Sequence, residues 1–205
     1  MKKLISICFL LLTFIACKKP GCTDPIAINY NSQANKDDGS CEYQIDKSII
    51  SQNITSDKTL SNDTIWTLQR RVAVESGVTL TIEPGTIIKA VAGTGANASS
   101  LIIARGAKIM AQGTPAQPII FTAESDNIQI GEIYGSSLNP NVRGLWGGII
   151  ILGNAPGSFT GNVESFQIEG IPASDINGLY GGTDPNDNSG ILSYVSIRHG
   201  GAEIG

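Results

Sequence analysis

Short runs of aliphatic and β-branched residues recur along this chain, and glycines separate them. Residues 80–87 read Leu-Thr-Ile-Glu-Pro-Gly-Thr-Ile, and residues 101–109 read Leu-Ile-Ile-Ala-Arg-Gly-Ala-Lys-Ile, so the two runs align when Leu80 is set on Leu101. Apolar residues alternate with others in both runs, and alternation is the side-chain period of a β-strand. Glycine permits a sharp corner after each strand. A repeat of this length and pattern predicts the coils of a parallel β-helix.

The same alignment predicts which residues share a column on neighbouring coils. Three pairs of residues coincide. We expect the two members of each pair to lie in one column, on strands about 4.8 Å apart. The pairs are Leu80 with Leu101, Ile82 with Ile103, and Gly85 with Gly106.

Three further strands and two long loops are expected beyond these runs. The strands are residues 118–122, 147–153 and 192–198, and residues 147–153 are apolar on both faces, as in a buried strand. The loops are residues 124–143 and 154–189. Loops that project from a rigid scaffold commonly carry function.

The composition supports an all-β fold. The chain holds 30 isoleucines and 24 glycines but only 2 methionines, which argues against a helical bundle. Its net charge of −4 argues against a general nucleic-acid binder, so no nucleic-acid partner is expected. With His199 as the single histidine, a multi-histidine metal site is excluded.

The N-terminus is typical of a targeting segment. A basic start precedes an apolar run at residues 4–15, which is too short to span a bilayer but suits the core of a signal peptide. Ala16-Cys17 resembles the lipobox of bacterial lipoproteins, with Phe14 in place of the usual leucine. The resemblance implies that residues 1–16 are removed and that Cys17 is the lipid attachment site. An ordinary signal peptide followed by a chance cysteine is the alternative.

A small cysteine module is expected at residues 17–44. Export would place Cys22 and Cys41 in an oxidising compartment, where an isolated pair forms a disulfide. Residues 21–43 closely resemble a module of the form GCTDPxAxNYNxxAxxDDGSCxY from surface and secreted proteins of Bacteroidota. A segment this short cannot bury a core of its own, so it needs a covalent staple.

Short oxygen-bearing side chains are concentrated in this module. Asp24, Asn31, Asp37 and Asp38 are ligand types that a hard cation such as Ca²⁺ prefers, although their spacing is not that of an EF-hand. The alternative is that these side chains cap turns. The sequence leaves both interpretations open.

Four blocks of the main domain, at residues 77–89, 113–122, 144–148 and 197–201, combine short apolar runs with glycines. These blocks resemble a family of bacterial surface proteins with a right-handed parallel β-helix of the pectin-lyase type. The resemblance implies an all-β solenoid over residues 45–205, behind the disulfide-stapled module. Because the helix continues further in that family, we expect it to be incomplete at its C-terminal end.

The resemblance also implies a function. Such proteins are commonly lipoproteins or secreted surface proteins, generally without a demonstrated activity. We therefore expect a non-enzymatic scaffold for binding or adhesion, anchored by lipid in the outer membrane and facing the cell surface or the periplasm. Its expected partner is an extracellular glycan or protein, and Tyr134 and Tyr180 are candidate ligand contacts because they lie in the expected loops. Trp146, beside an expected buried strand, is assigned to core packing.

The alternative function is a polysaccharide-active enzyme, either a lyase or a glycoside hydrolase, or its carbohydrate-binding accessory. Carboxylate pairs could support glycoside cleavage, and the candidates are Glu124 with Asp126 and Asp184 with Asp187. Both pairs lie in turn-like sequence and do not match polygalacturonase motifs. His199 has no nucleophile motif beside it and is expected at a coil corner, bonded to the backbone. No catalytic residue is therefore assigned.

The lipid anchor is directly testable. Because Cys17 would carry the acyl chains, the Cys17→Ala variant should leave the membrane fraction and appear in the soluble fraction. Retention of the variant in the membrane pellet after a carbonate wash would contradict the lipoprotein interpretation.

Overall fold

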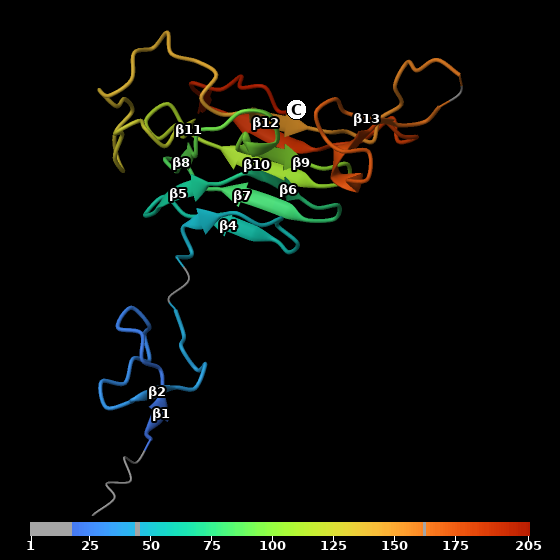
Figure 1. Cartoon of the computed structure of the whole chain (residues 1–205). Coiled ribbons are helices and arrows are strands. Elements are labelled where there is room, and N and C mark those ends of the chain that lie inside the picture. The colour runs from blue at the N-terminus through green and yellow to red at the C-terminus, as the bar shows by residue number, and fades with distance from the viewer. Residues whose placement is uncertain (1–17, 44–45, 162) are drawn as a thin grey trace, which may run out of the picture. The chain divides into compact units, whose positions relative to one another are not determined.

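The computed structural model describes residues 18–43, 46–161 and 163–205 (Figure 1). The chain divides into two compact units, Met1–Asp46 and Lys47–Gly205. The expected signal peptide and Cys17 lie outside the described residues. Within the described part of the chain, no helix has both the length and the apolar character needed to cross a membrane.

The first unit is a disulfide-bonded module. Strand β1 (Pro20–Gly21) pairs in parallel with β2 (Lys36–Asp37). Cys22 and Cys41 form the predicted disulfide, with their Cα atoms 4.7 Å apart. Cys22 is only 2% exposed, so the disulfide supplies much of the small interior that the module has.

The coils of the second unit are built from three parallel sheets that the chain visits in turn (Figure 1). One sheet contains β4 (Lys58–Leu60), β7 (Thr79–Ile82), β10 (Lys108–Gln112) and β15 (Gly190–Ser193). The second contains β3 (Ile49–Ile50), β5 (Ile65–Leu68), β8 (Ile87–Ala90), β11 (Ile119–Ala123) and β16 (Val195–Ile197). The third contains β6 (Arg71–Val74), β9 (Ser100–Ile103) and β12 (Gly148–Ile151).

The order of the strands defines the fold. The chain runs β4-β5-β6, then β7-β8-β9, then β10-β11-β12, so each coil adds one strand to each sheet. Every strand pairing within these three sheets is parallel. The predicted parallel β-helix is therefore confirmed.

The predicted column pairs, however, are wrong. Leu80 of β7 lies opposite Ile109 of β10, whereas Leu101 of β9 lies opposite Val72 of β6. Leu80 and Leu101 thus occupy two different sheets of one coil. The other predicted pairs fail in the same way, because Ile82 pairs with Leu60 and Ala111, Ile103 pairs with Val74 and Ile151, and Gly106 accepts a hydrogen bond from Gly77 rather than stacking on Gly85.

The error arises because the alternation of apolar residues marks a strand but does not show to which of the three sheets that strand belongs. Every strand of the coil presents alternate apolar residues to the same interior and ends near a corner. Setting Leu80 on Leu101 therefore matches a strand with the strand two sheets further along the same coil. The observed pairings of Leu80 with Ile109 and of Val72 with Leu101 share one offset, which is longer than the offset that the alignment used.

Two expected strands also differ in detail. Residues 192–198 form parts of two strands, because Tyr194 adopts φ = 49° and turns the chain from β15 into β16. The strand expected at residues 147–153 is shorter, and it lies at one edge of its sheet among the described residues. Its residue Ile151 is 42% exposed, so the expected burial on both faces is only partly met.

The inward side chains of the three sheets form one continuous core. Leu80, Ile103, Ile109, Ile119 and Phe121 are each at most 1% exposed. These residues come from all three sheets, which shows that the alternation of apolar residues did predict the inward faces correctly.

Two loops cover the outer faces of two sheets. Ile128 of the first loop (residues 124–143) packs on the outward residues Ile87 and Ile120. The second loop (residues 154–189) packs Ile168 and Ile171 on the outward face of β6, β9 and β12. The second loop also contains β13 (Phe166–Gln167), β14 (Leu179–Tyr180) and the short helix η2 (Ile176–Gly178), and its two strands pair antiparallel. A further short helix, η1 (Gly95–Asn97), lies between β8 and β9.

A pair of substitutions in one strand tests the inward and outward faces. Ile82 is 2% exposed, so Ile82→Asp would bury a carboxylate without a partner and should lower the free energy of unfolding by several kcal/mol. Thr81 is half-buried and points the other way, so Thr81→Asp should change stability little. Chemical denaturation of both variants measures the contrast, and equal losses of stability would contradict the assigned faces.

Candidate functional site

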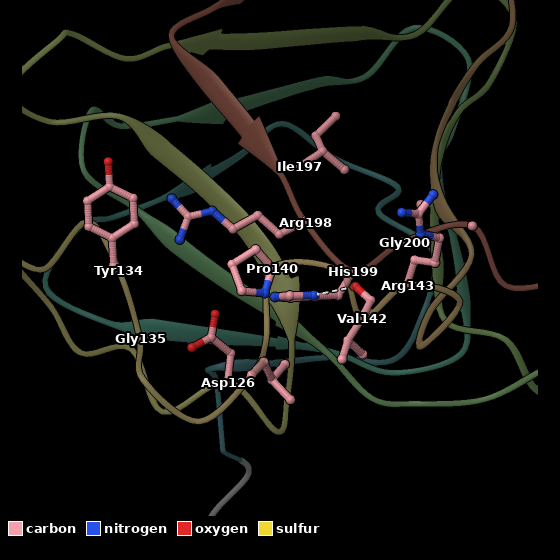
Figure 2. Close-up of a pocket in the computed structure, with 13 residues that line it drawn as sticks. Asp126, Tyr134, Gly135, Pro140, Val142, Arg143, Ile197, Arg198, His199 and Gly200 are labelled. Carbon is pink, nitrogen blue, oxygen red and sulfur yellow. Dashed lines mark hydrogen bonds between the residues drawn. The ribbon is translucent and has the colours of Figure 1, made fainter.

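A groove of about 660 Å³ opens between the first loop and the end of β16 (Figure 2). We call it the cationic groove, because Arg143 and Arg198 line it together with a single carboxylate, Asp126. Its lining also includes Tyr134 and His199. The first loop and the segment that follows β16 thus bring together residues far apart in the sequence.

His199 joins these two segments. It follows β16 and adopts φ = 57°, the left-handed conformation of a corner. Its ring Nδ1 lies 2.7 Å from the carbonyl oxygen of Val142, so Nδ1–H donates to that oxygen (Figure 2). In the neutral ring, Nε2 then remains as an acceptor. The structure agrees with the expectation of a corner histidine bonded to the backbone.

Arg198 is positioned by its neighbours in the chain and in the core. Its backbone carbonyl accepts a hydrogen bond of 2.7 Å from Nε1 of Trp146, and its own Nε donates to Oγ of Ser196 at 2.9 Å. Its guanidinium lies 5.5 Å from the centre of the Tyr134 ring, a cation–π distance. The guanidinium is therefore presented to the groove with an aromatic surface beside it.

Trp146 belongs to the core, as expected. It is 0% exposed, and its ring lies 6.4 Å from that of Phe121. A tryptophan buried in this way cannot stack on a sugar, but its hydrogen bond holds the backbone of the Arg198 corner.

Asp126 is occupied by structural hydrogen bonds. It is 4% exposed, and its carboxylate accepts from Oγ1 of Thr122 at 2.8 Å and from the amide of Ile128 at 3.1 Å. Nζ of Lys89 donates to its backbone carbonyl at 2.7 Å. The role of Asp126 is therefore to fold the first loop back onto β11. Its negative charge remains, so the two arginines and one carboxylate give the groove an excess of one positive charge.

The second pair of carboxylates also makes structural hydrogen bonds. Asp184 accepts from the amide of Asn186, two positions ahead, which is the ordinary turn chemistry of aspartate. Asp187 accepts from the amide of Asn154, 33 positions earlier, and so joins the two ends of the second loop. Of the four candidate carboxylates, only that of Asp126 lines the cationic groove.

The two candidate tyrosines lie at different sites. Tyr134 is 77% exposed in the cationic groove. Tyr180 lies in the second loop, where its ring is 5.6 Å from that of Phe159 in an edge-on contact, and it lines a separate groove of about 590 Å³. The structure therefore does not bring the two tyrosines into one site.

The four oxygen-bearing residues of the module each close a local turn. Asp24, Asn31, Asp37 and Asp38 accept hydrogen bonds from the amides two positions ahead. The bond from the amide of Ile26 and that from the Tyr43 hydroxyl lower the pKa of Asp24. Across residues 18–43, 46–161 and 163–205, no three His, Cys, Asp or Glu side chains are grouped to hold a metal.

Sequence reasoning considered the two arginines of the groove as candidates for a lyase's catalytic arginine, but assigned neither to a site, because no aspartate cluster lies near them in sequence. Arg143 and Arg198 are far apart in the sequence, and no motif joins them. The two blocks at residues 144–148 and 197–201 were the signal that could have joined them. The parallel bridge between Trp146 and Gly200 shows that these blocks lie at the same corner of successive coils. Residues beside those blocks are then close in space.

These coils and their loops define the chain as a parallel β-helix protein. A family model described as a pectate-lyase-like β-helix domain matches residues 52–205, and the chain belongs to this family. Comparison with curated proteins finds no match, and comparison with solved structures finds none either.

The bond between His199 and Val142 gives a test of how the groove is held. His199→Ala removes this bond and should speed amide exchange at residues 139–144 by about fivefold, because one hydrogen bond contributes about 1 kcal/mol. Hydrogen exchange followed by mass spectrometry measures the change. Tyr134→Ala, at an exposed position of the same groove, is the control and should leave this exchange unchanged. Equal exchange in the two variants would show that His199 does not hold the loop.

Proposed function

We propose that this protein is a lipid-anchored envelope protein whose β-helix serves as a non-enzymatic binding scaffold, with an acidic glycan held in the cationic groove. The observation that carries the proposal is the charge of that groove. Arg143 and Arg198 face it, while its one carboxylate, on Asp126, is bonded to the first loop.

The geometry suits a carboxylate-bearing sugar. Arginine presents several N–H donors in a plane that matches a carboxylate. Tyr134 adds an exposed ring and a hydroxyl beside Arg198. A groove of about 660 Å³ is within the range of about 300–1,000 Å³ typical of ligand sites.

The anchor is supported by the sequence alone. The apolar run at residues 4–15 and the Ala16-Cys17 pair are the features of an exported lipoprotein. We place the protein at the outer membrane, where a scaffold bound by lipid on Cys17 would meet an envelope or extracellular glycan.

A second candidate function is polysaccharide cleavage. The family description names a pectate lyase, and pectate is an acidic glycan. Nε2 of His199 is an acceptor in the groove and is the candidate for removing a proton. Incubation with polygalacturonate separates the two functions, because a lyase forms an unsaturated product that absorbs ultraviolet light, whereas a binding protein leaves the glycan intact.

Replacing both groove arginines tests the binding proposal. The Arg143→Gln/Arg198→Gln variant removes two charges from the groove and should bind oligogalacturonides at least about tenfold more weakly, because each charged hydrogen bond contributes about 1.5–3 kcal/mol. Titration calorimetry measures the affinity, which should also fall as salt is raised.

Lys47→Gln/Lys108→Gln is the matched control for charge, because it also removes two positive charges. Lys47 and Lys108 are exposed and do not line the groove, so their loss should leave binding almost unchanged. Equal weakening in both proteins would mean that general charge, rather than the groove, attracts the glycan.

A further inference from the structure

We propose a second binding site, for one ring of a neutral sugar, in a polar pocket between the coil corners and the second loop. The pocket has a volume of about 310 Å³. Its side chains come from two corners, at Ser76 and Arg105, and from the second loop, at Asn154, Glu164 and Thr183. It shares no lining residue with the cationic groove, so this inference goes beyond the proposed function.

The polar groups of this pocket are available to a ligand. Within the described residues, the side chains of Ser76, Asn154, Glu164 and Thr183 make no hydrogen bond or ion pair. Arg105 donates from Nη1 to the carbonyl of Gly181 at 2.7 Å and keeps its other N–H groups. Five side chains with unused donors or acceptors therefore line one small pocket that is open to solvent, and Ser76, Glu164 and Thr183 are exposed there.

The hydrogen-bonding groups of this pocket suit the neighbouring hydroxyl groups of a sugar ring. A hydroxyl both donates and accepts, and the pocket offers both capacities through its hydroxyl groups, its amide, its carboxylate and its guanidinium. The positive charge of Arg105 balances the negative charge of Glu164. The pocket thus favours a neutral polyol over an acidic sugar or an amine, in contrast to the cationic groove.

The size of the pocket limits the ligand. At about 310 Å³ it is at the lower end of the range for small-molecule sites, which suits a single sugar ring. Ser76 and Arg105 also line an adjoining cavity of about 270 Å³, beside Ile176 and Asn177. A substituent on the bound sugar ring could extend into this adjoining cavity.

Two arginines hold the loop that forms one wall. The bond from Arg105 to Gly181 is one attachment, and Nη1 of Arg71 donates to the carbonyl of Gly170 at 2.7 Å as the other. In both hydrogen bonds, an arginine of the coils donates to a backbone carbonyl of the second loop. These bonds hold the backbone at Gly170 and Gly181, the second of which precedes the lining residues Gly182 and Thr183, and a wall held before binding lowers the entropic cost of binding.

The experiment is a titration of the isotope-labelled mature protein, followed by two-dimensional NMR of its amides. The neutral probes are the methyl glycosides of glucose, galactose and mannose, and the charged probes are galacturonate and glucosamine. We expect at least one neutral glycoside to shift the amides of Gly106, Gly182 and Thr183 saturably. The charged sugars should shift the same amides less at equal concentration.

Paired variants assign the binding to the pocket. Ser76→Ala/Thr183→Val removes two hydroxyls and should weaken binding of the neutral glycoside about tenfold. Thr59→Val, at an exposed position of β4, is the control and should leave the affinity unchanged. Arg198→Gln should also leave it unchanged, so failure of the acidic-glycan proposal would not affect this result.

Three results would each overturn the inference. They are the absence of saturable shifts with every neutral glycoside, stronger shifts with a charged sugar, and equal weakening by the Thr59 control.

Discussion

The parallel ladder between successive coils is the interaction on which the rest of this structure depends. Each strand of one coil pairs in register with the strand above it, so an inward residue lies over another inward residue. Val72 lies beneath Leu101, which lies beneath Ile149, and the first two are almost completely buried. The stacked columns form a single core, and neighbouring coils stabilise one another.

The outer faces of the sheets explain where the loops lie. Ile87, Ile102 and Ile120 point away from the core and are each at most 1% exposed, because the two loops cover them. Ile128 holds the first loop on its sheet, and Ile168 and Ile171 hold the second loop on its sheet. The cationic groove and the polar pocket both form at the boundary between a covered sheet and its loop, where rigid backbone meets outward side chains.

Much of this fold was predictable from residue patterns, and the reason is that β-structure has a strict period. Alternation identified the inward residues Leu80 and Ile103 without knowledge of their partners. It could not give their register, since strands in different sheets present the same alternation to the same core. Register depends on the lengths of the corners, and the segment between β8 and β9 contains the helix η1, which no repeat predicted.

The candidate site was less predictable, because its members are joined only through the coil. Tyr134 was proposed from its place in a loop and lines the groove, but placing Arg143 and Arg198 beside it required knowledge that two corners are stacked. Asp126 was considered as a catalytic acid, whereas its burial and its bonds to Thr122 and Ile128 make it a support for the loop. A carboxylate in the sequence does not reveal whether its oxygens are already used.

The corners also explain why membership of the family determines the course of the backbone but does not identify the ligand. Arg70, Tyr194 and His199 adopt positive φ at corners, and such strain costs about 1–3 kcal/mol for a residue other than glycine. The ladder offsets it: the carbonyl of Arg70 accepts from the amide of Ser100, and that of His199 accepts from the amide of Leu145. These bonds involve only the backbone, so any side chain that tolerates the corner can stand there. A coil therefore fixes the position of an outward group without fixing its chemistry, and two pockets built on the same coils can differ in the charges that line them.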